Sequence, residues 1–236
     1  AGAQGDVLAR KLANQLVEID LLERAARLLK SQLQINNAGV PALELSIDLA
    51  KIQLMDRNPQ AALNTTRQAE NVYNALVKSV TDKDSPQLAN ARTLYEDVLF
   101  YRAKALADDG DNDKALALLA TLPKNEQVLT LRADIAWTAQ NWAQAATALG
   151  NFIDFKNIRA EAQASLVLNW AIALNLADDS AGIEAAKTRF GPSMKASNRA
   201  QEFEIVTRPQ REIFMSDRDT INRIVSEVDI FDAFIK

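Results

Sequence analysis

The chain contains neither histidine nor cysteine, so any acid–base chemistry would have to rest on carboxylates. This excludes cysteine and histidine nucleophiles, the usual zinc sites and disulfides. A glycan-cleaving enzyme could still use a glutamate, provided that its pKa is raised in a cleft. The candidates are Glu161, Glu184, Glu202 and Glu204, each in a pattern typical of a solvated helix face. Without a glycine-rich phosphate loop or a nucleophile elbow, we expect no enzyme and no cofactor, and carboxylate catalysis stays the remote alternative.

A calcium loop is the second chemical possibility. The run from Asp109 to Asp113 alternates aspartate with glycine and asparagine, as calcium loops do. An EF-hand loop needs glycine at its sixth position and glutamate at its twelfth, where this chain has Lys114 and Ala120. We therefore expect a turn between two helices whose aspartates cap the second helix, and no metal site.

Charge and hydropathy limit the partners. The net charge of −4 gives no basis for nucleic-acid binding. The longest uncharged run, residues 135–153, carries several amide and hydroxyl side chains, so we expect no membrane insertion by this chain. Absence of cysteine suits an oxidising compartment. Since the chain opens at Ala1, we expect a processed form or fragment, with the periplasmic part of an anchored bacterial protein favoured over a cytoplasmic one.

Glycine and proline divide the chain into helical segments. The breakers include Gly39, Pro59, Gly110, Pro123 and Gly150, and between them apolar residues recur every three or four positions. Ser85 followed by Pro86 is a typical helix start. This pattern predicts ten or more helices and no strand.

The predicted helices form pairs in which two alanines stand 12 positions apart. The pairs are Ala13 with Ala25, Ala50 with Ala62, Ala103 with Ala115, Ala133 with Ala145 and, less regularly, Ala173 with Ala185. A turn residue follows the first alanine by seven positions, as at Asp20, Gly110 and Gln140. Small residues at facing positions let two antiparallel helices approach closely. The spacing therefore predicts a series of helical hairpins.

In this pattern the chain resembles the tetratricopeptide repeat family. The best matching segments are residues 129–145 and 99–119, and the resemblance covers roughly residues 6–190. It implies an all-α, right-handed superhelix of hairpins over residues 1–192, closed by a C-terminal helical cap over 193–236 that packs on the same solenoid. Spacings of 37, 53, 30 and 40 residues between the first-helix alanines indicate variable connections, the longest around Thr81–Pro86.

The resemblance also implies a function and a surface for it. Members of the family are non-catalytic scaffolds that bind a peptide or helix in the concave groove. The resemblance implies the same role for this chain, and we expect its setting to be a bacterial envelope assembly. Carried over by register, the groove residues are Asn14, Lys51, Phe100, Lys104, Thr130, Asp134 and Trp137. These positions do not reproduce the family's asparagine–lysine clamp for carboxyl termini. The alternative for each is an ordinary inter-helix or solvent-exposed residue.

The composition changes near the C-terminus, where leucine no longer occurs after Leu176. One helical face there gathers Ile221, Ile224, Val225, Val228, Phe231 and Ile235. We expect this helix to cap the open end of the stack. The alternative is a self-associating spacer, a homo-oligomer joined through Phe231, Phe234 and Ile235.

Overall fold

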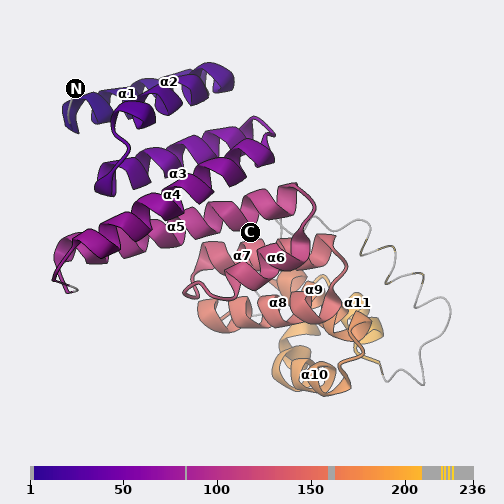
Figure 1. The fold of residues 1–236 in the computed structure, drawn as a ribbon. Coiled ribbons are helices and arrows are strands. Elements are labelled where there is room, and N and C mark those ends of the chain that lie inside the picture. The colour runs from indigo at the N-terminus through magenta and orange to yellow at the C-terminus, as the bar shows by residue number, and fades with distance from the viewer. Residues whose placement is uncertain are drawn as a thin grey trace. The chain divides into compact units, whose positions relative to one another are not determined.

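The computed structural model describes residues 3–82, 84–158 and 163–208, together with positions 219, 221, 223 and 225. The described residues contain eleven helices and no strand (Figure 1). The helices are α1 (Ala3–Glu18), α2 (Leu22–Ile35), α3 (Gly39–Met55), α4 (Pro59–Ser79), α5 (Pro86–Asp108), α6 (Asn112–Leu119), α7 (Glu126–Thr138), α8 (Trp142–Lys156), α9 (Ala164–Leu176), α10 (Ser180–Met194) and α11 (Ala200–Val206). The prediction of an all-α fold is confirmed.

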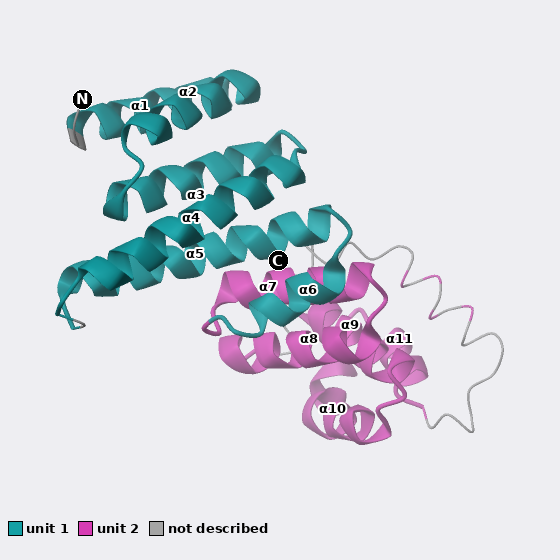
Figure 2. Cartoon of the chain, viewed as in Figure 1, with its two compact units in different colours: residues 1–122 teal, residues 123–236 magenta. Residues whose placement is uncertain are grey.

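The chain divides into two compact units, residues 1–122 and residues 123–236 (Figure 2). The first unit holds α1 to α6, and each of these helices packs against the next. In the second unit α7 packs on α8, α8 on α9, and α9 on both α10 and α11. The division between the units falls inside the segment 1–192 that the sequence assigns to repeats. Helix α11 lies in the predicted capping segment, and Asn175 of α9 donates a hydrogen bond of 2.8 Å to the Val206 carbonyl at its end.

Each hairpin turns in the same way. One residue with a left-handed backbone follows the first helix, namely Asp20, Arg57, Gly110, Gln140 or Asp178. The next residue donates its N–H to the carbonyl five positions before it, at 2.8–3.0 Å, as Asn58 does to Gln53. This is the Schellman arrangement, which satisfies carbonyls left free at a helix end. The repeated turn defines the register of the hairpins.

The first four alanine pairs are buried, as their spacing predicts. The fifth pair is wrong by two positions. The turn at Asp178 places Ala171 and Ile183 at the equivalent sites, and both are buried, whereas Ala185 is exposed. Several small residues in α9 permit more than one pairing at this spacing, so the turn, rather than the alanines, decides the register.

Polar side chains cap the helices as the sequence indicates. Asn58 accepts a hydrogen bond from the Ala61 N–H at the start of α4, and Ser85 accepts one from Leu88 at the start of α5. Asp111, in the run that resembles a calcium loop, accepts one from Lys114 and so caps α6. The predicted capping role of this aspartate is confirmed.

Candidate binding groove

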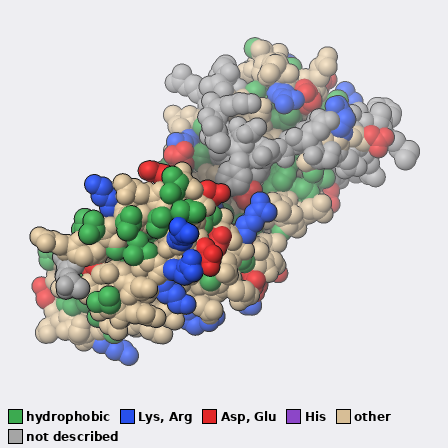
Figure 3. Space-filling view, turned by 90° about the horizontal axis from the view of Figure 1, so that it is seen from above, with side chains coloured by type: hydrophobic (Ala, Val, Ile, Leu, Met, Phe, Trp, Pro, Cys, Tyr) green, Lys and Arg blue, Asp and Glu red, His purple; other side chains and the backbone are tan. Residues whose placement is uncertain are grey.

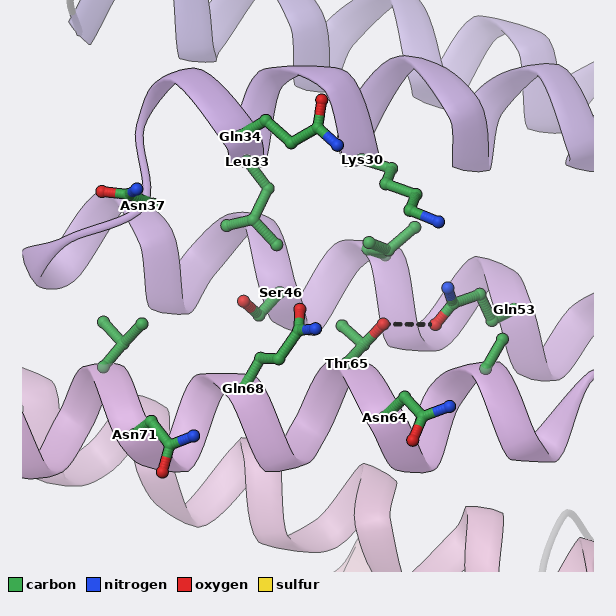
Figure 4. A pocket seen from close by; sticks show the side chains of 13 residues that line it. Lys30, Leu33, Gln34, Asn37, Ser46, Gln53, Asn64, Thr65, Gln68 and Asn71 are labelled. Carbon is green, nitrogen blue, oxygen red and sulfur yellow. Dashed lines mark hydrogen bonds between the residues drawn. The ribbon is translucent and has the colours of Figure 1, made fainter.

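A groove of about 740 Å³ lies in the first unit, between α2 and α4 and over α3 (Figure 4). Its walls come from the second helices of two successive hairpins and its floor from the helix between them. The thirteen lining residues are Lys30, Leu33, Gln34, Asn37, Ser46, Leu49, Gln53, Ala61, Asn64, Thr65, Gln68, Asn71 and Val72. Nine of the thirteen are polar, and six of these nine are asparagine or glutamine.

The floor of the groove is buried and internally hydrogen-bonded. The Ser46 hydroxyl donates to the Ala42 carbonyl at 2.7 Å, and Leu49 beside it is almost fully buried. The Thr65 hydroxyl donates to the Gln53 side-chain carbonyl at 2.9 Å, across from α4 to α3. Because this bond engages the carbonyl oxygen of the Gln53 amide, it orients the side chain and leaves the NH₂ group to donate (Figure 4).

The rim carries exposed amides. Asn64, Gln68 and Asn71 lie along the side of α4 that lines the groove. Opposite them, Gln34 lies near the end of α2, and Asn37 lies just after that helix. Asn64 accepts a hydrogen bond from Arg67 at 3.1 Å. Within the described part of the chain, the side chains of Gln34, Asn37, Gln68 and Asn71 form no hydrogen bond. Each is therefore available to donate and accept bonds with a bound molecule.

Charge is scarce in the groove. Among its thirteen lining residues, all of them described, Lys30 is the one charged residue, and none is aromatic or acidic. A general acid, a carboxylate ligand for a metal and a stacking platform for a sugar are thus all missing from this lining. The arrangement is suited to hydrogen bonding with a neutral polar chain and to contact with small apolar groups.

Four of the sequence-predicted residues lie elsewhere in the first unit, on the first helices of its hairpins. Asn14 is on α1, Lys51 on α3 and Lys104 on α5, and all three are exposed; Phe100 on α5 is half-buried. We call the side of α1, α3 and α5 that carries these residues the first-helix face. None of the four lines the groove.

The first-helix face is charged. On its α1 and α3 part, Arg10 donates to Glu44 at 2.8 Å and to Asp48 at 2.5 Å. Between α3 and α5, burial, followed by the charges of Asp97 and Asp48, raises the pKa of Tyr101. Arg10 is thus paired with two carboxylates of α3, unlike the amides of the groove.

The other three predicted groove residues belong to α7 in the second unit. Thr130 and Asp134 are half-buried. Trp137 is only 7% exposed and meets Trp142 edge to face, with ring centroids 5.3 Å apart. This position corresponds to the alternative that the sequence left open, an inter-helix residue, and leaves little of the ring for a partner.

The remaining sequence candidates are dispersed. Glu184 and Glu204 are exposed, Glu202 pairs with Arg199 at 3.1 Å, and Glu161 lies outside the described residues. Phe231, Phe234 and Ile235 also lie outside them; within the same predicted stripe Ile221 is buried. No group of three acidic residues placed to hold a metal occurs among the described positions. In the part that the structure describes, no helix is long and apolar enough to cross a membrane.

A second hollow, of about 440 Å³, lies in the second unit between α8, α9 and α10. Trp170 is half-buried on one side of it and donates its indole N–H to the Ala146 carbonyl at 3.1 Å. A Cβ atom at Gly150 would stand 3.1 Å from the same nitrogen. Close packing of Trp170 therefore accounts for the glycine at position 150.

Sequence reasoning missed the amide-lined groove, although a signal for it was present. On α4, uncharged polar residues recur at positions 64, 65, 68 and 71, the three- and four-residue spacing of one helical face. Such a stripe without charge is unusual for a helix side in water. Comparisons of the chain with protein-family models, curated proteins and solved structures found no match, so its function has to be argued from this geometry.

Proposed function

We propose that this protein is a non-catalytic scaffold that holds an extended segment of a partner protein in the groove between α2 and α4. The observation that carries the proposal is the row of amide side chains along the groove, four of which form no hydrogen bond among the described residues. Unpaired amides beside a concave surface are suited to a ligand that brings its own donors and acceptors.

The chemistry of the row favours an extended main chain over a helix. A carboxamide offers one acceptor and two donors in a plane, which matches the N–H and C=O groups of a peptide. In a helix those groups are already paired internally, whereas an extended segment leaves them free. From Asn64 to Asn71 the rim runs about 10 Å along α4, which is the length of about three extended residues.

The rest of the lining indicates which segments fit. Leu33 and Val72 are half-buried and offer apolar surface for an aliphatic side chain. Lys30 at the rim favours an acidic residue over a basic one. We therefore expect a neutral or mildly acidic peptide with an aliphatic residue at its centre.

The wider assignment is part of the same proposal. The identical turn in five hairpins supports a tetratricopeptide-like repeat, and the absence of cysteine suits a protein of the bacterial periplasm. We propose a place in an envelope assembly on these grounds.

Panning a library of random peptides against the full chain would supply the ligand for a test. Changing Gln68→Ala or Asn71→Ala should weaken binding of an enriched peptide about five-fold each, because one net hydrogen bond contributes about 1 kcal/mol. Methylation of the peptide's main-chain nitrogens should weaken its binding as well, because it removes the N–H donors that the amides would accept. Fluorescence anisotropy of the labelled peptide measures both effects.

The matched control is a change on the first-helix face. Lys51→Ala with Lys104→Ala alters two exposed residues outside the groove and should leave the peptide affinity unchanged. If this pair abolishes binding while the two amide variants do not, the ligand lies on the first-helix face and the groove proposal is wrong.

A further inference from the structure

The repeated turn makes equivalent positions comparable between hairpins. Twelve residues before the left-handed residue of each turn lies an apolar residue of the first helix. In α1, α3, α5 and α9 these are Leu8, Leu45, Val98 and Leu166. The last three are at most 1% exposed, whereas Leu8 is 67% exposed. The same position is thus a core site in later hairpins and an open surface in the first.

What buries this position in the later hairpins is the second helix of the hairpin before. Leu45 packs in one cluster with Ala25 and Leu29 of α2. In the next hairpin Val98 packs with Ala69 and Leu76 of α4. In both cases the covering helix presents an alanine and, a turn or two later, a leucine.

The exposed side of α1 continues beyond Leu8. Leu12 follows four positions later, which places it on the same side of the helix, and it is 45% exposed. Leu12 is the equivalent of Leu49, which is nearly fully buried under α2. Figure 3, which looks from above onto the molecule as drawn in Figure 1, shows hydrophobic side chains gathered on the surface of the first unit.

We infer that the side of α1 that carries Leu8 and Leu12 is a docking surface for a partner helical hairpin, whose second helix covers it as α2 covers α3. The covering helix carries an alanine and a leucine four residues apart, as Ala25 and Leu29 are spaced. This surface is separate from the groove, which α1 does not line. The protein therefore joins a neighbour through α1 while the groove stays open.

The chain itself supplies the probe for a test. A second copy of residues 3–38 is joined ahead of residue 3 of the full chain, so that the added α2 leads into α1 as α2 leads into α3. Amide hydrogen exchange in the original α1 should slow at least ten-fold, because the added helix buries its exposed side. Unchanged exchange in α1 would overturn the inference.

Two further measurements complete the design. Leu8→Gln with Leu12→Gln in the original hairpin should cancel the protection, and circular dichroism should show these exposed changes to leave the helices intact. Sedimentation of the unextended chain tests the other occupant. If the chain forms concentration-dependent dimers that these two changes abolish, the surface binds a second copy of this chain, and the inference of a hairpin partner is overturned. A monomer at every concentration supports the hairpin partner.

Discussion

Tyr95 lies at the centre of a polar contact that joins α4 to α5. Its hydroxyl donates to Glu70 at 3.1 Å, and its ring stacks on Tyr73 with centroids 4.1 Å apart. Arg102 donates to the other oxygen of Glu70 and to the Thr66 carbonyl, both at 2.9 Å. Burial alone would raise the pKa of Glu70, but the hydrogen bond and charge of Arg102 and the bond from Tyr95 bring it below its ordinary value.

This contact predicts a loss of stability at alkaline pH. Burial, followed by the nearby Glu70 carboxylate, raises the pKa of Tyr95 to about 12, above the value of about 10 in an unfolded chain. The neutral hydroxyl therefore contributes its full stabilisation below about pH 10, and the contribution is lost as the pH rises towards about 12. Tyr95→Phe should remove this part of the pH dependence, as measured by urea unfolding across that range.

A spectroscopic control uses the other tyrosine of the stack. Tyrosinate absorbance should show late ionisation of Tyr95 and also of Tyr101, whose pKa is raised as well. Tyr95→Phe should remove one of these late steps, whereas Tyr73→Phe should leave their number unchanged. If Tyr95→Phe leaves the number of late steps unchanged, the pKa of Tyr95 is not raised by the contact with Glu70.

At the scale of the element, helix packing decides what a leucine contributes. Leu8 and Leu45 stand at the same register position of α1 and α3, yet one is exposed and the other is fully buried. Leu45→Ala should lower the free energy of unfolding by about 2–5 kcal/mol, because it leaves a cavity among Ala25, Leu29 and Leu49. Leu8→Ala should change it by less than about 0.5 kcal/mol.

Denaturant unfolding of the two variants side by side measures this difference, with the same chemical change in both. An equal cost at both positions would mean that α1 is already covered in solution, by a second copy or otherwise. That result would link the stability of α1 to protein concentration.

At the scale of the whole molecule, the groove belongs to one compact unit. All of its lining residues lie between Lys30 and Val72, within residues 1–122. Stacked hairpins draw their stability from their neighbours, and this unit contains three hairpins in succession. Residues 1–122 expressed alone should therefore fold and bind a groove peptide with the affinity of the full chain.

Circular dichroism and fluorescence anisotropy of this fragment provide the measurement. Residues 1–79, which keep all the lining residues but lack α5 and α6, are the matched comparison. They should bind more weakly, since α4 then loses the cover of Val98 and Arg102. Equal affinity in both fragments would show that α5 does not support the groove.

The sequence by itself determined the elements and their pairing. Alanines 12 positions apart, capping residues such as Asn58 and Ser85, and turn residues at fixed offsets predict helical hairpins because these signals act over a few residues. Where one helix offers several small residues, as α9 does, the local signal does not settle the register, and Ala171 and Ile183 take the places predicted for Ala173 and Ala185.

Tertiary structure decided the sites. The amides of Gln34 and Gln68 stand 34 positions apart in sequence and share a groove only because α2 and α4 both pack on α3. Trp137 packs edge to face against Trp142 inside the second unit. Leu8 is exposed and Leu45 is buried, although the two leucines occupy the same position relative to the turn of their hairpin. Periodicity identifies the sides of a helix, but burial depends on which neighbour covers each side, and that is a property of packing between helices.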